Sequence, residues 1–474
     1  MLQRSDVHVV PSPNGTPLRV CHLGKYYAPA TGGIETHVQT LARAQAELGL
    51  GVRVICVDHS GGIEPTHGQR LGTLNAWCED DGAVRVTRTA RRVSVNRLDI
   101  CPDLPAVLRS LEKEPADILH LHTPNPTMLL AMAMVRPNIP LVITHHSDII
   151  RQKLLKLALR PFERFVYSRA ARIQTTSPVY VQGSRFLERY NGRVEVLPLG
   201  LDLSPYSAPP PAASARADEL KAKHGAPLWL AVGRLVYYKA LHVALHALAR
   251  IPGKLILIGA GPLEAELKDL ARRLGVHKRV IWRGYVSHDE LVACYRAATA
   301  LWFPSNARSE AFGLVQVEAM ASGCPVINTD IVGSGVPWVS QNETSGLTVP
   351  VNDPEALAAA ARRLLDEPGL RDRLSRGGLR RAAEEFDHLT MAHRSLAIYQ
   401  RALRGEPAAA AVAPEVVPAR PARRNEGYEL VDASEFGIAT HLDVQSEAKG
   451  HDFRGAGFPD ANITPIFRDP LRRD

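Results

Sequence analysis

The sequence predicts an α/β protein with two doubly wound parallel sheets. Short aliphatic runs alternate with helix-length patterns from residue 18 onward, as in parallel sheets that are covered by helices. A proline-rich stretch at 204–212 interrupts this alternation, which then resumes. The chain of 474 residues exceeds one typical domain, and its 45% hydrophobic content supports two large cores.

The first half contains six strand-like runs rich in β-branched and aliphatic residues. Most of them are separated by segments with helical periodicity, and Gly49 is placed to end the first of these helices. We therefore expect one Rossmann-like domain over residues 18–203, after an N-terminal extension at 1–17. The expected strands are 18–24, 52–57, 116–122, 140–146, 172–177 and 194–200, and the expected helices are 34–48, 124–135 and 179–190.

The second half repeats the same pattern. The expected strands are 228–233, 254–259, 280–286, 300–305 and 325–330, and the helices between them are 241–249, 263–274, 289–298 and 313–322. Three more helical patterns follow, at 354–366, 370–386 and 389–403. We expect these two Rossmann-like halves to face one cleft.

Composition shifts divide the chain further. We expect a linker region at 204–218, because proline continues neither a helix nor a central strand. A second Rossmann-like domain is expected at 219–387 and a final helix at 388–404. Residues 405–474 begin with a Pro/Ala/Arg-rich run, so we expect a linker and a tail there.

The net charge of +8 and the pI near 9.2 favour acidic partners, such as nucleotide phosphates or an anionic membrane face. Nucleic acid is disfavoured, because no compact motif of Lys, Arg and aromatic residues is present. The six cysteines lie far apart without a C-x-x-C pair and are expected to be reduced core residues. The longest strongly apolar stretch, 128–135, is too short to span a bilayer, so we expect a cytoplasmic protein without a transmembrane anchor.

The most informative segment is 309–326, which carries two carboxylates around a glycine turn. Glu310 follows the expected strand 300–305, and Glu318 lies about one turn into the next helix. Free N–H groups at a helix start favour anions, and a buried glutamate accepts hydrogen bonds from vicinal hydroxyls such as those of a ribose. The alternative is an amphipathic helix with two solvated glutamates.

Polar residues also follow the strands of the first half, where ligands bind in open α/β sheets. Gly32 and Gly33 open a helix and leave space for a phosphate; a tight turn is the alternative. His120 and His122 share one face of a strand. Two histidines at this spacing also suggest a metal, but no acidic or cysteine partner is near, so we favour a hydrogen-bonding role for His122 and a packed one for His120.

The strand 140–146 ends in the paired histidines His145 and His146, which are polar enough to line an acceptor side. A solvated strand end explains them equally well. In the second half, Arg234 and Lys239 follow a strand, and together they suit a diphosphate leaving group. An exposed pair of surface cations is the alternative here.

Two further turns follow strands of the second half. Gly259 and Gly261 form a tight turn, and the run 283–286 is placed to clamp a base through its backbone groups. A purely structural turn is the alternative for each.

Taken together, these motifs resemble the retaining nucleotide-sugar glycosyltransferases of family four, the group 1 glycosyl transferases. The resemblance runs from about residue 18 to 403. It implies the GT-B architecture, with an N-terminal acceptor domain, a C-terminal nucleotide-sugar donor domain, a final helix that packs back on the first domain, and catalysis without a metal. Within this family, the runs 146–153 and 333–339 resemble bacterial mannosyltransferases of exopolysaccharide assembly.

The resemblance implies a role for each matching residue. It assigns the donor diphosphate to Arg234 and Lys239, sugar hydroxyls to Glu310, and a place beside the transferred sugar to His122. The implied catalytic residues are therefore His122, Arg234, Lys239 and Glu310. The implied donor-binding residues are Gly32, Gly33, Gly259, Gly261, Tyr285, Val286, Phe312, Gly313, Leu314 and Glu318, and the acceptor-side residues are His145 and His146.

The implied reaction transfers a hexose, with mannose as a candidate, from a GDP- or UDP-hexose to a saccharide or polyprenyl-diphosphate-linked acceptor. No other cofactor is implied. Retention implies a front-face route in which the leaving diphosphate accepts the acceptor proton, so neither carboxylate is a nucleophile. A nucleotide-sugar epimerase and a nucleotide-binding scaffold are the alternatives. The loop 333–335 and Ala240 depart from the family pattern.

The segment 151–169 combines helical apolar spacing with many cations. This pattern is typical of interfacial helices and also of basic surface helices. We favour docking to an anionic membrane, which would place the protein peripherally on the inner face of the plasma membrane. Pro161 predicts a kink or a division into two short helices.

Overall fold

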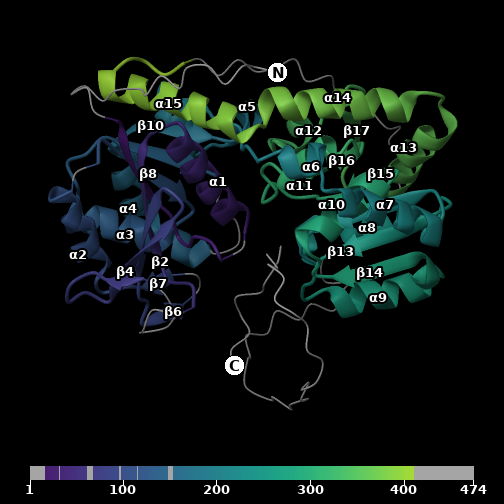
Figure 1. Ribbon diagram of the computed structural model, residues 1–474, viewed down its shortest axis with the longest axis horizontal. Helices are drawn as coiled ribbons and strands as arrows, with labels where there is room; N and C mark the ends of the chain where they lie inside the picture. The colour runs from purple at the N-terminus through teal and green to yellow at the C-terminus, as the bar shows by residue number, and fades with distance from the viewer. Residues whose placement is uncertain are drawn as a thin grey trace, which may run out of the picture.

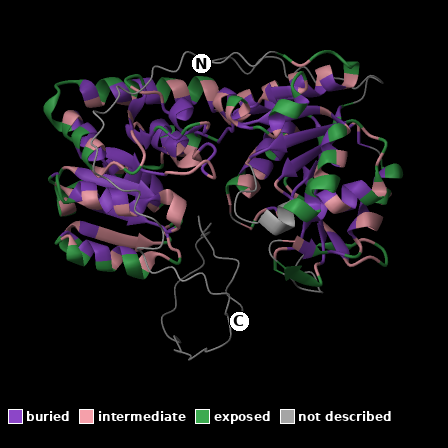
Figure 2. Ribbon diagram, turned by 180° about the vertical axis from the view of Figure 1, so that it is seen from behind, coloured by how far each residue is buried: buried purple, intermediate pink, exposed green. Residues whose placement is uncertain are grey.

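The computed structural model describes residues 17–30, 32–60, 68–95, 98–114, 116–147 and 153–409. These residues form two α/β domains, each built on a mostly parallel sheet with helices on both faces (Figure 1). Figure 2 shows buried strands inside each domain and exposed outer faces on the surrounding helices. The extension 1–16 and the tail 410–474 lie outside the described residues.

The first sheet has nine strands in the order β11-β10-β9-β8-β1-β2-β5-β4-β3. Strands β1, β2 and β8 to β11 correspond to the six expected runs. In the parallel pair of β1 and β8, His22 lies beside His120. The strands are β1 Arg19–Leu23, β2 Gly51–Val57, β3 Gln69–Arg70, β4 Ala76–Asp81, β5 Val84–Thr89, β8 Ile118–Thr123, β9 Leu141–His145, β10 Ala170–Thr175 and β11 Val194–Val196.

Strands β3, β4 and β5 were not predicted, and neither was the two-stranded hairpin of β6 (Val93–Val95) and β7 (Leu98–Ile100). β4 runs antiparallel to both of its neighbours. In β5, buried Val84 and Val86 alternate with exposed Arg85. Thr87, Arg88 and Thr89 are buried as well, and these polar and charged residues hide the strand from a search for continuous aliphatic runs.

The second sheet has six parallel strands in the order β14-β13-β12-β15-β16-β17. All carboxyl ends therefore point to one edge, which is where the expected donor-binding residues follow the strands. The sheet places β15 directly beside β12. The strands are β12 Leu228–Val232, β13 Lys254–Ile258, β14 Val280–Gly284, β15 Ala300–Phe303, β16 Val326–Thr329 and β17 Gly346–Val349.

Helices connect the strands of both domains. The first domain has α1 Gly33–Glu47, α2 Leu104–Arg109, α3 Pro126–Val135, α4 Lys153–Ser168 and α5 Pro178–Gly183. The second has α8 Leu241–Leu248, α9 Glu264–Arg273, α10 His288–Ala297, α11 Leu314–Ala321, α12 Val336–Val339, α13 Pro354–Asp366 and α14 Leu370–Glu385. The expected helix 179–190 is replaced by α5 and a 3-10 turn at Leu187–Tyr190. Pro161 does not divide α4 into two short helices, which was one of the two outcomes expected there. The helix is continuous from Lys153 to Ser168.

The expected linker region 204–218 contains helical structure, although its prolines predicted that no helix continues there. It forms α6 (Ser204–Ser207) and most of α7 (Pro211–His224). The prolines lie at the first positions of these helices, where the missing N–H would have no partner in any case. Leu220 of α7 joins the core of the second domain, so this segment packs as part of that domain.

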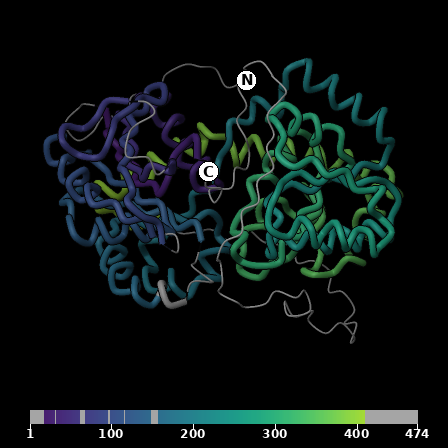
Figure 3. Tube along the Cα trace, turned by 90° about the horizontal axis from the view of Figure 1, so that it is seen from below, coloured from purple at the N-terminus to yellow at the C-terminus, as the bar shows by residue number. Residues whose placement is uncertain are grey.

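The last helices connect the two domains. α14 packs on the second domain, and α15 (His388–Arg404) then packs against α1 of the first domain. Met391, Leu396 and Tyr399 of α15 are buried in one cluster with Val38 and Leu41 of α1. Figure 1 shows α14 and α15 in line along one side of both domains, and Figure 3 shows the two domains side by side.

The domains also touch next to the expected site. A Cβ atom on Gly183 of α5 would lie 2.7 Å from the Cα of Gly333, in the loop after β16. The guanidinium of Arg308, in the loop after β15, lies 4.9 Å from the ring centre of Tyr180 in α5. Helix α5 of the first domain therefore packs directly on loops of the second.

Candidate active site

The loops after β12 and β15 are joined by the backbone. The amide of Asn306 donates to the carbonyl of Tyr238 at 2.9 Å. Because β12 and β15 are neighbours in the sheet, both loops leave it at the same edge. This contact brings Lys239 and Glu310, which are 71 positions apart, into one place.

Lys239 and Glu310 form an ion pair, with Lys239 Nζ 2.5 Å from Glu310 Oε2. Each side chain is 12% exposed, so the pair is shielded but reachable. The hydroxyl of Ser305 donates to the same carboxylate oxygen at 3.3 Å. The ammonium also lies 4.7 Å from the ring centre of Phe303, which favours a cation there.

Gly233 leaves room for the stem of this lysine. Its φ of +149° suits glycine, and a Cβ atom would lie 3.1 Å from Lys239 Cε. Ala240, directly after the lysine, has a left-handed φ of 46°. This left-handed conformation favours glycine and makes alanine a strained choice.

Arg234 is exposed near the same carboxylate. Its Nη2 donates to the Tyr238 hydroxyl at 3.1 Å. Partial desolvation by its neighbours lowers the pKa of Arg234, whereas the Tyr238 hydroxyl raises it. The carboxylates of Glu310 and Glu35 raise it further, and the net shift is upward. Glu35 belongs to α1 of the first domain. Arg234 therefore interacts electrostatically with a carboxylate from each domain.

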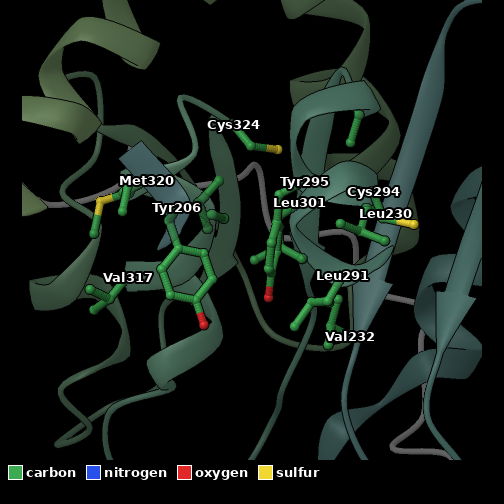
Figure 4. Close-up of a cluster of buried hydrophobic side chains, with 14 of the residues drawn as sticks. Tyr206, Leu230, Val232, Leu291, Cys294, Tyr295, Leu301, Val317, Met320 and Cys324 are labelled. Carbon is green, nitrogen blue, oxygen red and sulfur yellow. The ribbon is translucent and has the colours of Figure 1, made fainter. Parts of the chain in front are cut away.

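Glu318 projects from α11 toward two buried tyrosines. The Tyr295 hydroxyl donates to Glu318 Oε2 at 2.7 Å. Burial raises the pKa of Glu318 to about 7, although Tyr295 and Lys239 oppose the shift. The hydroxyl oxygens of Tyr206 and Tyr295 point the same way from the hydrophobic cluster in Figure 4, and Glu318 raises the pKa of both tyrosines further. The carboxylate of Glu318, whose ionisation burial disfavours, thus lies close to the ion pair of Lys239 and Glu310.

The start of α11 is held in place by packing. Gly313 has a φ of +79°, and a Cβ there would lie 2.6 Å from the ring of Phe303. Leu314 is the first residue of α11. The side chain of Phe312 is buried against Trp338 and Phe386, which fixes the backbone that precedes the helix.

The Glu310 loop is also bonded to the loop 333–335, where the sequence departs from the family pattern. The Ser334 hydroxyl donates to the Glu310 carbonyl at 2.5 Å, and the Gly335 amide donates to the Ala311 carbonyl at 2.9 Å. The unusual loop therefore supports Glu310 directly. The sequence marked Ser334 only as part of the loop that departs from the family pattern, and it assigned no role to Ser305.

The glycine turn after β13 has a structural explanation. A Cβ atom on Gly259 would overlap the carbonyl of Gly233, and one on Gly261 would lie 2.6 Å from the carbonyl of Leu235. The turn therefore packs against the loop that carries Arg234 and Lys239. The structural alternative accounts for both glycines, and their donor-binding role stays a prediction.

The residues after β14 lie at the same edge of the sheet. The Gly284 carbonyl accepts from the Gly259 amide at 2.8 Å, which ties this turn to the one after β13. Tyr285 is 42% exposed, and Val286 packs against the core that contains Leu291. Their contact with a base stays a prediction.

In the first domain, α1 begins at Gly33, and a Cβ there would meet no atom within 4 Å. A Cβ on Gly32 would overlap the side chain of Glu35. Gly33 therefore borders open space, as a phosphate contact requires, whereas Gly32 makes room for Glu35.

His122 is buried in a group of histidines. Its Nε2 lies 3.0 Å from His22 Nδ1, and its Nδ1 lies 3.3 Å from His146 Nε2. Burial lowers the pKa of His122 well below the usual value, so the ring is neutral. Both ring nitrogens thus face protein neighbours, and the exposure of His122 is only 1%.

His145 is separated from His146 by the alternation of the strand. Its Nδ1 lies 2.7 Å from the Tyr167 hydroxyl, and its ring stacks on Phe186. The structure therefore does not bring His145 together with His122 and His146. Adjacent residues of a strand point to opposite faces of the sheet, so the sequence already indicated that His145 and His146 have different surroundings.

Comparisons with known proteins identify the family. Residues 215–381 match the model of the glycosyl transferases group 1, and residues 32–200 match that of a glycosyl transferase 4-like domain. The chain is 32% identical over 373 residues to D-rhamnosyltransferase WbpZ of Pseudomonas aeruginosa, which covers 78% of this chain and 92% of that protein. The chain belongs to the group 1 glycosyl transferases. The resemblance inferred from the sequence is thereby confirmed.

This glycosyl transferase is also similar to other proteins. It is 29% identical to O-antigen chain mannosyltransferase C of Escherichia coli, over 80% of this chain and 98% of that one. A sucrose-phosphate synthase from Thermosynechococcus elongatus has a TM-score of 0.66 at 23% identity and covers 82% of this chain and all of its own. Anabaena Alr3699/HepE in complex with UDP has a TM-score of 0.61 at 18% identity and covers 81% and 100%. These structures confirm the GT-B fold.

Among the residues that the structure describes, 17–409 apart from the gaps given above, no helix has the length and apolar character needed to cross a bilayer.

Proposed function

We propose that this glycosyl transferase moves a hexose, with retention and without a metal, from a nucleotide diphosphate sugar to a saccharide or lipid-linked saccharide during polysaccharide assembly. The observation that carries the proposal is the ion pair of Lys239 and Glu310 beside Glu318, at the carboxyl edge of the second sheet. The name of the Escherichia relative, an O-antigen chain mannosyltransferase, supports a polysaccharide acceptor and makes mannose the first sugar to test.

The donor diphosphate is assigned to the two cations. In the free protein Glu310 neutralises Lys239 at 2.5 Å, and Arg234 feels the same carboxylate. A diphosphate that enters beside Lys239 takes over this neutralisation, which frees Glu310 to accept hydrogen bonds from sugar hydroxyls. As the bond to the sugar breaks, Lys239 and Arg234 stabilise the charge that develops on the leaving diphosphate.

The ribose is assigned to Glu318. Its carboxylate already accepts one hydrogen bond from Tyr295, and the second oxygen is available for a ribose diol. The acceptor is assigned to the first domain, near Gly33 and His146. Direct contact of His122 with the sugar requires one of its present imidazole partners to give way, because both of its nitrogens are in use.

Donor screening tests this assignment. GDP-, UDP- and dTDP-hexoses are compared by saturation-transfer NMR, and the best donor is then incubated with saccharide acceptors. We expect nucleoside diphosphate release that depends on an acceptor, and a product whose anomeric configuration equals that of the donor. Release or isomerisation without an acceptor would support the epimerase alternative, which no observation on the described residues favours.

We also propose that α4 docks on an anionic membrane surface. Leu157 and Phe162 are 65% and 41% exposed, and Arg160 and Arg164 are exposed on the same helix. Residues 151–152, and the side chains of 153–156, lie outside what the structure describes. Apolar side chains beside cations suit an interface with anionic head groups.

Sedimentation with vesicles of phosphatidylglycerol and phosphatidylcholine tests the membrane proposal. We expect binding at low salt that weakens as salt rises, and weaker binding for Leu157→Gln/Phe162→Gln. Leu379→Gln, which replaces a 39% exposed apolar residue on α14, is the matched control and should bind like the wild type. Equal binding to purely zwitterionic vesicles would contradict an electrostatic contribution.

A further inference from the structure

Five buried histidines gather at the carboxyl edge of the first sheet. They come from β1, α1, β8 and the residue after β9, and each is at most 6% exposed. Burial lowers the pKa of every one, so the rings are neutral near pH 7 and offer lone pairs rather than charge. The five are His22, His37, His120, His122 and His146.

Hydrogen-bond directions in this cluster follow from Ser395 of α15. The Ser395 hydroxyl donates its one hydrogen to the Ala392 carbonyl at 2.7 Å, so it can only accept from Gln45, 2.8 Å away. The Gln45 atom that faces Ser395 is therefore the amide nitrogen. The Gln45 oxygen then faces His22 Nε2 at 2.8 Å, which places the proton of His22 on Nε2.

The tautomer of His122 follows from that of His22. His22 Nδ1 carries a lone pair, so His122 Nε2, 3.0 Å away, must donate the hydrogen. The remaining nitrogen of His122, Nδ1, is then a lone pair that faces His146 Nε2 at 3.3 Å. A chain from Gln45 through His22 thus fixes His122 with its Nδ1 lone pair toward His146.

His37 of α1 has no protein partner for either ring nitrogen among the described residues, although it is only 1% exposed. Its ring centre lies 5.5 Å from that of His122 and 5.0 Å from that of His146, edge-on in both cases. A buried imidazole without a partner is costly and requires an explanation.

Two groups of three histidines in the described residues could hold a metal ion. In the group of His22, His120 and His122, His120 is already bonded through both nitrogens, to Tyr399 at 2.6 Å and to Thr144 at 2.6 Å. That group is satisfied by the protein alone. The other group, which includes the unpartnered His37, is not.

We propose that His37, His122 and His146 bind one Zn²⁺ ion. Their ligand atoms lie within 4.8 Å of one another. The separation of 3.3 Å between His122 Nδ1 and His146 Nε2 matches the ligand spacing of a tetrahedral site with Zn–N bonds of about 2.0–2.1 Å. It is long for an N–H···N hydrogen bond between the two rings.

The surroundings suit the ion in a second way. A metal-bound histidine usually donates its other ring N–H to an acceptor, which orients the ring. His122 does this through Nε2 to His22, which Gln45 in turn holds. To bind, His146 gives up the proton on Nε2 and takes one on Nδ1, so its net charge does not change. Three nitrogen ligands leave a fourth position open.

Zinc at this place has a consequence for catalysis that rests on the proposed function. Because His122 and His146 are assigned to the sugar and acceptor side, an ion bound to both withdraws them from the reaction. The family resemblance implies transfer without a metal, so the site is inhibitory rather than catalytic. We expect Zn²⁺ to inhibit sugar transfer reversibly and a chelator to restore it.

Binding is tested on the full chain after dialysis against a chelator. Zn²⁺ is titrated by calorimetry, and Co²⁺ is added to a second sample, because a tetrahedral Co²⁺ site absorbs visible light. We expect one ion per chain and at least a tenfold loss of Zn²⁺ affinity in His37→Gln. Gln45→Met should lower the affinity by about 10–100-fold without removing a ligand.

His120→Gln is the matched control, since it removes a buried histidine of the same cluster that is not a ligand. It should bind Zn²⁺ within about twofold of the wild type. Equal loss of affinity in His37→Gln and His120→Gln, or stoichiometric binding that His37→Gln leaves unchanged, would overturn the proposal, as would the absence of binding. A water molecule would then account for His37.

Activity gives an independent arm. His37→Gln should transfer sugar at the rate of the metal-free wild type and should resist Zn²⁺ that inhibits the wild type. Binding measured by calorimetry and by Co²⁺ absorption needs neither donor nor acceptor. Failure of the proposed transfer reaction therefore leaves the metal site testable, and failure of the metal site leaves the reaction unaffected.

Discussion

The ammonium of Lys239 lies 2.5 Å from a carboxylate oxygen of Glu310, so the residue assigned to the diphosphate and the residue assigned to the sugar neutralise each other in the free protein. A ligand that carries both groups separates this pair without leaving either charge uncompensated. A nucleotide or a sugar alone replaces only one partner, and we expect each to bind more weakly than the complete donor.

Replacement of Lys239 should slow transfer strongly. Lys239→Ala removes a cation from the leaving diphosphate, and the loss of such a preorganised group typically costs about 100-fold or more in kcat. Steady-state kinetics with saturating donor measure the effect. Lys268→Ala is the matched control, because Lys268 is paired with Glu264 on exposed α9 of the same domain. Unchanged kcat in Lys239→Ala would contradict the assigned role.

The same ion pair should be coupled in stability. Lys239→Ala leaves Glu310 shielded without its cation, and Glu310→Ala does the converse, so each single variant should be destabilised. The double variant should unfold more easily than the wild type by less than the sum of the two, with a coupling of about 0.5–3 kcal/mol. Denaturant unfolding of the wild type, the two single variants and the double variant measures this coupling. Strict additivity of the two effects would show that the pair is not formed in solution.

Glu318 should make stability depend on pH. Burial raises its pKa from 4.5 to about 7, so between these values the unfolded chain releases a proton that the folded protein keeps. Stability therefore falls as pH rises through this window, by up to about 3 kcal/mol. Glu318→Gln should remove the penalty and be more stable than the wild type at pH 8 but not at pH 4.5, as measured by denaturant unfolding. Glu266→Gln, on exposed α9, should show no such difference.

The affinity for the donor should rise as pH rises, whereas stability falls. The ribose diol is assigned to the ionised form of Glu318, so the affinity for the donor should fall as pH drops below about 7. Glu318→Gln should bind the donor weakly at every pH between 6 and 8. Isothermal titration of nucleotide sugar across this range measures the profile, and a wild-type affinity that does not vary would remove Glu318 from the site.

Ala240 offers a test of the strained turn beside Lys239. Its φ of 46° costs an L-residue roughly 1–2 kcal/mol, whereas glycine adopts it freely at some cost in chain entropy. Ala240→Gly should therefore stabilise the protein by up to about 1 kcal/mol and leave the donor KM unchanged. Ala249→Gly, at the helix end with a φ of −65°, is the control and should be destabilising or neutral.

The sequence predicted the elements that carry the site because they are continuous and apolar. Strands β1, β8, β12 and β15 are mostly apolar. Arg234 and Lys239 follow β12 and Glu310 follows β15, whereas His122 lies within β8 itself. β5 was missed because arginine and threonine interrupt it, and α7 because its prolines suggested a break although they lie at its start.

Several site residues could not be found because their roles arise from tertiary contacts. Tyr295 lies near the C-terminal end of α10, and only folding brings its hydroxyl to Glu318. Gln45 lies in α1 and meets Ser395 from the far end of the chain. No local pattern marks either residue. The different surroundings of His145 and His146 were accessible, since a strand alternates its faces.

Helix α15 completes the first domain although more than 180 residues of the second lie between them. Until the ribosome has made residue 404, Val38 and Leu41 lack part of their hydrophobic cover and Gln45 lacks two of its hydrogen-bond partners. During synthesis the first domain therefore keeps part of its hydrophobic core exposed until the second domain and α15 have been made. A fragment that stops at residue 203 should aggregate, and one supplied with the α15 peptide should be rescued.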